Sequence, residues 1–226
     1  MIDVHSHVIP FVDDGSKNTE ISLSMLETIG KCGVTDVICT PHYRRSMFEA
    51  PKEIIIDNFE KLKAANKTGV RLHLGQEIAY DPQVFTKLER GELLTYCGSE
   101  YVLLEFSYTR YIDISNVVFE CKLRGYKPVI AHIERYEYIG VDDVEEIRSG
   151  GALIQVNADS LFFGSPYHGV SSKYLRRDLV DIIANDFHSN RKYLMDKAYN
   201  KVKRKYGEER SNRLFVENPE LLIKND

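Results

Sequence analysis

Seven short, mostly apolar segments recur along the chain, and the stretches between them are typical of helices and loops. The segments span residues 2–5, 36–40, 70–75, 101–104, 128–131, 152–156 and 180–184. Strands that are buried on both faces are apolar throughout, and their alternation with helices is typical of a parallel β-sheet. The pattern therefore predicts an α/β fold with seven strands.

A residue that can bind a metal ion stands at or just after the end of nearly every predicted strand. These residues are His5, His42, Glu77, Glu105, His132, Asn157, Asp186 and His188. In a (β/α) barrel the carboxyl ends of all strands converge on one site, whereas an open doubly wound sheet presents its ligands at a single crevice. Ligands spread over so many strand ends therefore favour a barrel.

The first fifteen residues hold the densest group of possible ligands. His5 and His7 are two positions apart on a predicted strand, so their imidazoles lie on the same face. Pro10 then turns the chain, and the Asp-Asp-Gly run at residues 13–15 brings two carboxylates back towards the histidines. Taken alone, the histidine pair is as well explained by coincidence and the Asp-Asp-Gly run by an ordinary turn. The ligands at the other strand ends favour a metal site.

The composition describes an ordinary globular chain. Its 226 residues are 43% hydrophobic and 28% charged, and we expect one domain over residues 1–226. The net charge of −4 does not favour binding to nucleic acid. No apolar run approaches the ~20 residues of a membrane span, so we expect neither membrane insertion nor a signal peptide. The four scattered cysteines lack a C-x-x-C motif and indicate reduced thiols in a cytoplasmic protein.

The candidate metal ligands form a set of five imidazoles and four carboxylates: His5, His7, Asp14, His42, Glu77, Glu105, His132, Asp186 and His188. This set exceeds the shell of one ion, which takes about four to six ligands. Two or three divalent ions that share a bridging carboxylate would use all of it. With three ions the site would keep a net positive charge, which suits a phosphate monoester. Imidazoles and carboxylates without a thiolate fit Mn²⁺, Fe or Zn²⁺ and do not choose among them.

Together these motifs resemble a known family. They are His5-x-His7, the Asp-Asp-Gly turn, Pro41-His42, Gly75-Gln-Glu77, Glu105, Ala131-His-Ile-Glu-Arg135 and Asn185-Asp-x-His188. The combination is similar to the polymerase-and-histidinol-phosphatase (PHP) superfamily. Within it, the chain more closely resembles the bacterial branch of manganese-dependent tyrosine-protein phosphatases from capsule and exopolysaccharide operons.

The resemblance implies a distorted seven-stranded (β/α)7 TIM-like barrel with three Mn²⁺ ions per chain. The family pattern assigns one ion to His5, His7, Glu77 and Asp186, a second to Glu77, Glu105 and His132, and the third to Asp14, His42 and His188. As substrate it implies a phosphotyrosine protein, namely a bacterial tyrosine kinase that regulates capsule synthesis. The sequence departs from the family pattern at Phe187, where a smaller residue is expected.

Arg135 and Arg191 each follow a candidate ligand by three residues, after His132 and His188 respectively. A guanidinium group matches two phosphate oxygens at once and can neutralise charge in the transition state. We therefore interpret both arginines as candidate catalytic residues that hold the substrate phosphate. The alternative is that they are surface arginines that cap loops.

Two other residues are interpreted as structural. Cys39 and Arg45 have the C-x5-R spacing of a cysteine phosphatase loop. The segment between them lacks the glycines that direct backbone N–H groups at a phosphate, so we expect Cys39 to be a core thiol. His73 lies within a predicted strand and is expected to be structural as well.

The predicted function is hydrolysis of phosphotyrosine monoesters by attack of a metal-bound hydroxide. The alternatives are a small-molecule phosphatase such as a histidinol phosphatase, a phosphodiesterase or exonuclease, and a metal-binding module without catalysis. The acidic net charge counts against the nuclease. The complete ligand set and Arg135 count against the non-catalytic module.

Overall fold

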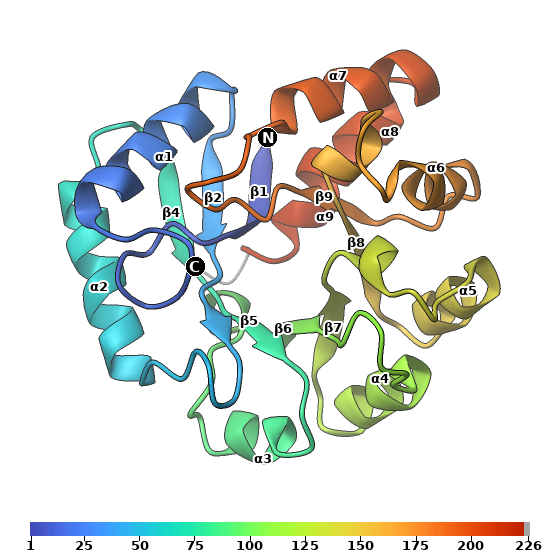
Figure 1. The fold of residues 1–226 in the computed structure, drawn as a ribbon, viewed down its shortest axis with the longest axis horizontal. Coiled ribbons are helices and arrows are strands. Elements are labelled where there is room, and N and C mark those ends of the chain that lie inside the picture. Colours follow the sequence, from blue (N-terminus) through green and yellow to red (C-terminus); the bar gives the residue numbers. More distant parts are fainter. Residues whose placement is uncertain (224–226) are drawn as a thin grey trace.

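The computed structural model describes residues 1–223 and shows parallel strands surrounded by a ring of helices (Figure 1). The strands are β1 (Ile2–Ser6), β2 (Asp36–Cys39), β3 (His42–Tyr43), β4 (Arg71–Leu74), β5 (Glu77–Ala79), β6 (Tyr101–Glu105), β7 (Lys127–Ile130), β8 (Leu153–Asn157) and β9 (Ile182–Ala184). The domain expected over residues 1–226 includes residues 224–226, which lie outside the described part.

The strands form two parallel sheets, in the order β1-β2-β4 and β3-β5-β6-β7-β8-β9. β3 follows β2 after a break at Pro41, and β5 follows β4 after a break at Gly75, so the strands trace seven courses around a barrel. The barrel closes where Ser6 pairs with Phe187 and the N–H of His7 donates to the carbonyl of Phe187 over 2.9 Å. The predicted distorted seven-stranded barrel is confirmed.

The breaks in two predicted strands have a local cause. Pro41 has no N–H to donate, which interrupts the ladder after β2. At Gly75 the backbone passes so close to its neighbours that a Cβ atom would lie 3.1 Å from the ring of Tyr96 and 3.3 Å from the side chain of Ile38. Both breaks let the chain bend, so that His42 and Glu77 begin the short strands β3 and β5.

The helices lie outside the barrel, and their order alternates with the strands (Figure 1). They are α1 (Thr19–Lys31), α2 (Lys52–Ala65), α3 (Val84–Glu89), α4 (Ile114–Leu123), α5 (Val141–Ser149), α6 (His168–Arg176), α7 (Met195–Tyr206), α8 (Glu208–Asn212) and α9 (Asn218–Glu220). Short turns η1 (Tyr96–Gly98), η2 (Ile133–Arg135), η3 (Asp159–Leu161) and the π-helical η4 (Arg213–Glu217) join them. Asn18 caps α1 by accepting the N–H of Ile21 over 2.8 Å. Within residues 1–223 none of the helices combines the length and apolar character that crossing a membrane needs.

The buried apolar residues form a large cluster and a smaller one. The smaller cluster gathers side chains from β1, β2, β6, β7 and β9, namely Ile2, Val4, Ile38, Leu103, Val129 and Ile182. Because strands from several sides of the barrel contribute to it, this cluster lies in the barrel interior. On β6 and β9 it lies two residues or more before the polar ends at Glu105 and Asp186.

A β-bulge in β1 orients His5 and His7. Ile2 and Val4 belong to the interior cluster, so in an unbroken strand His5 would face the opposite way. The pairing with β2 slips by one residue between Asp3 and Ser6. Such a bulge redirects the side chains that follow it, and His5 contacts Glu77 at the barrel end.

Candidate metal centre

Glu77 lies at the centre of a cluster of polar side chains at the carboxyl ends of the strands. Its Oε2 atom lies 3.2 Å from His5 Nε2, 3.3 Å from His7 Nε2 and 2.9 Å from His42 Nδ1. Its Oε1 atom lies 3.0 Å from His132 Nε2. Burial by itself would raise the pKa of this carboxyl, but His5 and His42 outweigh burial and hold it well below its usual range. Glu77 is therefore ionised among four imidazoles.

Two buried acceptors orient His5 and His7. The Nδ1 atom of His5 lies 3.1 Å from Gln155 Oε1, and that of His7 lies 2.8 Å from Asp13 Oδ2. Since both partners are acceptors, each imidazole donates from Nδ1 and turns the lone pair of Nε2 towards Glu77. The two Nε2 atoms are only 3.3 Å apart, an arrangement that a bound cation stabilises.

A second group lies at the mouth of the site. His188 Nε2 and His42 Nε2 lie 3.3 Å and 3.7 Å from Asp14 Oδ1, and the Asp14 side chain is 56% exposed. Burial and the neighbouring His7 lower the pKa of His188 to about 4, so that this imidazole is neutral near pH 7. A neutral imidazole can donate its lone pair to a metal ion.

The predicted ligands fall into three overlapping groups that are compact enough for a metal ion. They are His5, His7 and Glu77; His42, Glu77 and Glu105; and His7, Asp14, His42 and His188. Asp186 Oδ1 lies 3.4 Å from His7 Nε2, beside the first group. His132 Nε2 lies 3.8 Å from Glu105 Oε1, beside the second group. All nine predicted ligands therefore lie in one connected cluster, although their binding of metal remains a prediction.

Buried atoms without hydrogen-bond partners support the fit to metal ions. Among the described residues, Glu77 Oε2 and His188 Nε2 are buried and make no hydrogen bond of acceptable geometry. Leaving such atoms unpaired is costly, and coordination of a cation would satisfy them. The chemistry of the donors, imidazole nitrogen and carboxylate oxygen, matches that need.

The two predicted catalytic arginines meet at one ligand. Arg135 Nη1 lies 2.9 Å from Asp186 Oδ2, and Arg191 Nη1 lies 2.6 Å from the same oxygen. Burial would raise the pKa of Asp186, but His5, His7 and Arg135 hold it well below its usual range. Both guanidinium groups are thus at the edge of the connected cluster of nine predicted ligands, which we call the metal cluster. A substrate phosphate at this edge could contact them.

The backbone is strained at two of the proposed ligands. His132 has a φ of 29° and Asp186 a φ of 52°, in a region that side-chain-bearing residues rarely adopt. Gly15 makes a different close approach, since a Cβ atom there would lie 2.1 Å from the carbonyl oxygen of His7. The Asp-Asp-Gly turn therefore requires glycine in order to lie against the histidine pair.

Three polar residues of the site were not predicted. Asp13 and Gln155 orient His7 and His5, and Arg44 Nη2 donates to Glu105 Oε2 over 2.5 Å. Residues two apart on a strand share a face, and this alternation could have indicated two of them. Gln155 is two residues before Asn157, and Arg44 is two residues after His42. Asp13 stands beside Asp14 in one turn, and the family pattern assigns only Asp14 as a ligand, so it gave no role to Asp13.

Cys39 and His73, interpreted as structural, are buried or paired, and Phe187, the departure from the family pattern, is buried. Cys39 is fully buried, and burial raises the pKa of its thiol, which is the opposite of an activated nucleophile. His73 Nε2 lies 2.9 Å from Asp36 Oδ1. Phe187 is buried against Tyr193, with ring centroids 4.8 Å apart. None of the three lies in the three ligand groups.

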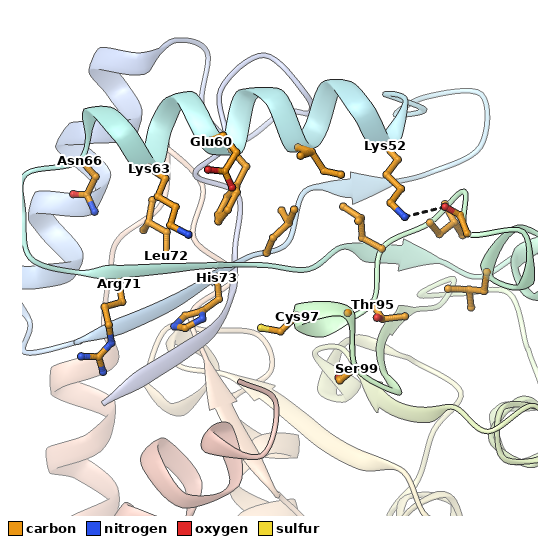
Figure 2. A pocket seen from close by; sticks show the side chains of 18 of the residues that line it. Lys52, Glu60, Lys63, Asn66, Arg71, Leu72, His73, Thr95, Cys97 and Ser99 are labelled. Atoms are coloured by element: carbon orange, nitrogen blue, oxygen red, sulfur yellow. Dashed lines mark hydrogen bonds between the residues drawn. The ribbon is translucent and has the colours of Figure 1, made fainter. Parts of the chain in front are cut away.

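A large cavity lies away from the metal cluster. It has a volume of about 1060 Å³ and lies between α2, β4 and the η1 turn, with Lys52, Lys63 and Arg71 among its lining residues (Figure 2). None of the nine proposed ligands lines this cavity. We locate the chemistry by the convergence of titratable side chains, because cavity size alone does not indicate catalysis.

Replacing Asp13 by Asn should weaken metal binding. Asp13 Oδ2 accepts from His7 Nδ1 and from the N–H of His42, while Oδ1 accepts from the N–H of Gly15. An amide has only one acceptor oxygen and no charge, so it cannot keep both sides of this set, and the hold on the imidazole of His7 weakens. Loss of such a partner costs about 10- to 100-fold in metal affinity or activity. Metal titration followed by aryl phosphate hydrolysis measures the effect, with the exposed Asp57→Asn on α2 as the control. Equal metal affinity in Asp13→Asn and the parent protein would contradict the assigned role.

Comparison with known proteins places the chain among proteins of capsular polysaccharide synthesis. A family model described as capsular polysaccharide synthesis, CpsB/CapC, matches residues 1–224. The chain is 36% identical to the tyrosine-protein phosphatase CpsB of Streptococcus pneumoniae, over 99% of this chain and 98% of that protein. It is 29% identical to the tyrosine-protein phosphatase YwqE of Bacillus subtilis (strain 168), over 100% and 92%.

Solved structures agree with the fold. The chain is similar to a structure from a report on YwqE from Bacillus subtilis and CpsB from Streptococcus pneumoniae, which are described there as metal-dependent tyrosine phosphatases. The TM-score is 0.92, with 26% identity over 100% of this chain and 95% of the other. A histidinol phosphate phosphatase of Lactococcus lactis shares the fold alone, with a TM-score of 0.59 and 13% identity over 95% of each chain. The predicted family resemblance is confirmed, and the chain belongs to the CpsB/CapC family of capsular polysaccharide synthesis.

Proposed function

We propose that this protein is a metal-dependent tyrosine-protein phosphatase that hydrolyses phosphotyrosine monoesters. The observation that carries the proposal is the cluster of three overlapping ligand groups around Glu77, with Arg135 and Arg191 at its edge. The family relationship agrees with it, because the relatives described above are tyrosine-protein phosphatases.

We propose that His5, His7, Glu77 and Asp186 hold one ion, that Glu77, Glu105 and His132 hold a second, and that Asp14, His42 and His188 hold a third. His7 and His42 each belong to two of the compact groups and could serve both. The donor set suits Mn²⁺, with Fe or Zn²⁺ as alternatives. When bound, such ions supply positive charge to the phosphate and lower the pKa of water.

The chain's own part in the reaction is to bind and orient the phosphoryl group. Arg135 and Arg191 both reach Asp186 and can turn a second N–H towards a phosphate oxygen. Tyr108 donates from its hydroxyl to Glu105 Oε1 over 2.9 Å, and Arg44 holds the other oxygen of that carboxylate. These contacts fix Glu105 from the side that faces solvent.

The depth of the cluster favours phosphotyrosine over phosphoserine. His5, His7 and Glu77 are fully buried, so only a phosphate on a long side chain can reach them from a protein surface. Exposed apolar side chains stand in loops that follow β1, β3, β6 and β8, namely Phe11, Met47, Tyr108, Tyr111 and Phe163. Loops after the strands surround the site in a barrel, and aromatic side chains there can hold a phenyl ring and its peptide.

We further propose that the substrate protein is a bacterial tyrosine kinase of capsule synthesis, as the family resemblance implies. Residues 1–226 would act as one metallophosphatase domain. The free and buried thiols of Cys39 and Cys121 support a cytoplasmic location.

An assay with metal-reconstituted protein tests the function. We expect turnover of a phosphotyrosyl peptide with Mn²⁺ and loss of turnover in excess chelator. A phosphoseryl peptide of the same sequence and histidinol phosphate should each react at least about tenfold more slowly, since neither places its phosphate at the end of an aromatic ring. Faster hydrolysis of histidinol phosphate would favour the small-molecule phosphatase, and no hydrolysis with any metal would favour a non-catalytic module.

A further inference from the structure

A groove beside the metal cluster is bordered by cations. It has a volume of about 660 Å³ and lies between α1 and the loop from β9 to α7, which run near each other in Figure 1. We call it the lysine groove after Lys17, Lys192 and Lys197, which line it together with Arg191. The buried rings of Phe187 and Tyr193 also line it.

The positive charge of the three lysines in the groove is not compensated by an ion pair among the described residues. Within residues 1–223 no Asp or Glu lines the groove, and its three lysines are exposed. Among the described residues, none of these three lysines forms an ion pair, whereas Lys31 pairs with Glu27 and Lys61 with Asp57. An open set of like charges over an aromatic floor is suited to anionic side chains.

The groove continues into the metal cluster. Arg191 lines the groove and also donates to Asp186 Oδ2 over 2.6 Å. Ser189, another lining residue, donates from its hydroxyl to the carbonyl of Gly15, next to Asp14. The segments that carry Asp14, Asp186 and His188 therefore also form walls of the groove, so the groove adjoins the cluster.

We propose that the lysine groove is a specificity subsite that binds acidic residues near the phosphotyrosine of the substrate. The proposal rests on the proposed function, since the phosphotyrosine places the peptide. The three lysines complement two or three carboxylates, and the floor formed by Phe187 and Tyr193 can hold their aliphatic stems. This gives a role to Phe187, which departs from the family pattern by its size.

A matched pair of triple variants tests the proposal. The test variant carries Lys17→Gln, Lys192→Gln and Lys197→Gln. The control carries Lys67→Gln, Lys122→Gln and Lys173→Gln, which are exposed lysines away from the groove, so that both proteins have the same net charge. Each metal-loaded protein is assayed on phosphotyrosyl peptides and on a small aryl phosphate. The peptides carry either three Glu or three Gln, placed before or after the phosphotyrosine.

We expect the parent protein and the control to prefer an acidic peptide by about tenfold in kcat/KM at low salt, mainly through KM. The test variant should lose most of this preference and should hydrolyse the aryl phosphate at the parental rate. Added salt should reduce the preference in the parent protein. Equal preference in the test variant and the parent, or an equal loss in the control, would overturn the subsite.

Two further outcomes separate this proposal from others. If the parent protein hydrolyses no phosphotyrosyl substrate, the proposed function fails, and the affinity of the two variants for an unphosphorylated Glu-rich peptide still decides the groove. Binding to anionic lipid vesicles that exceeds binding to the acidic peptide, and that the test variant alone loses, would overturn the subsite in favour of a membrane-binding face.

Discussion

Replacing Glu77 by Gln should abolish phosphatase activity and metal binding together. Glu77 approaches four imidazoles and belongs to two of the three ligand groups, so its charge acts on more of the cluster than that of any other proposed ligand. Gln keeps the shape but removes the charge that attracts the cations. We expect kcat to fall by at least about a thousandfold, because ligands that act as one unit fail together.

Elemental analysis and aryl phosphate turnover measure the effect of Glu77→Gln. The exposed Glu60→Gln on α2 is the matched control and should keep both metal content and turnover. The far-ultraviolet circular dichroism of Glu77→Gln should match that of the parent, so that loss of activity is not loss of fold. Two or three bound ions with near-parental turnover would contradict the bridging role of Glu77.

Replacing Arg135 by Ala should reduce kcat by about a hundredfold or more. A guanidinium that holds phosphate oxygens acts on charge that is redistributed in the transition state, and loss of one such donor has an effect of this size. Arg135→Lys should recover only part of the loss, since an ammonium group lacks the planar pair of donors. The loss should be similar for a small aryl phosphate and a phosphotyrosyl peptide, because the arginine contacts only the phosphoryl group.

Metal content is an essential control for Arg135→Ala, because Arg135 contacts the proposed ligand Asp186 directly. We expect metal content to be retained, since Arg191 still pairs with the same carboxylate oxygen and loss of a cation does not weaken cation binding. The exposed Arg176→Ala on α6 should behave as the parent protein. Near-parental kcat in Arg135→Ala on both substrates would make Arg135 a structural residue.

Much of the fold and most of the site residues could be predicted from the sequence because both depend on short-range patterns. Apolar runs of strand length, separated by helices, are enough to predict parallel strands. Parallel strands in a barrel bring their carboxyl ends together, so a residue such as Glu105 or His132 could be placed by its position after a strand alone. The family resemblance implied the same arrangement.

Other features depend on contacts between distant segments, and only the tertiary structure decided them. Alternation predicts that His5 and His7 share a face, but the bulge against β2 decides that this face is the barrel interior. The pairing of His5 with Gln155, and of Arg135 with Asp186, depends on how segments far apart in the chain meet. Local sequence determined which groups can bind a metal ion or a phosphate, because this is a property of each side chain. Which groups orient the others is set by packing, and a linear pattern does not encode those distances.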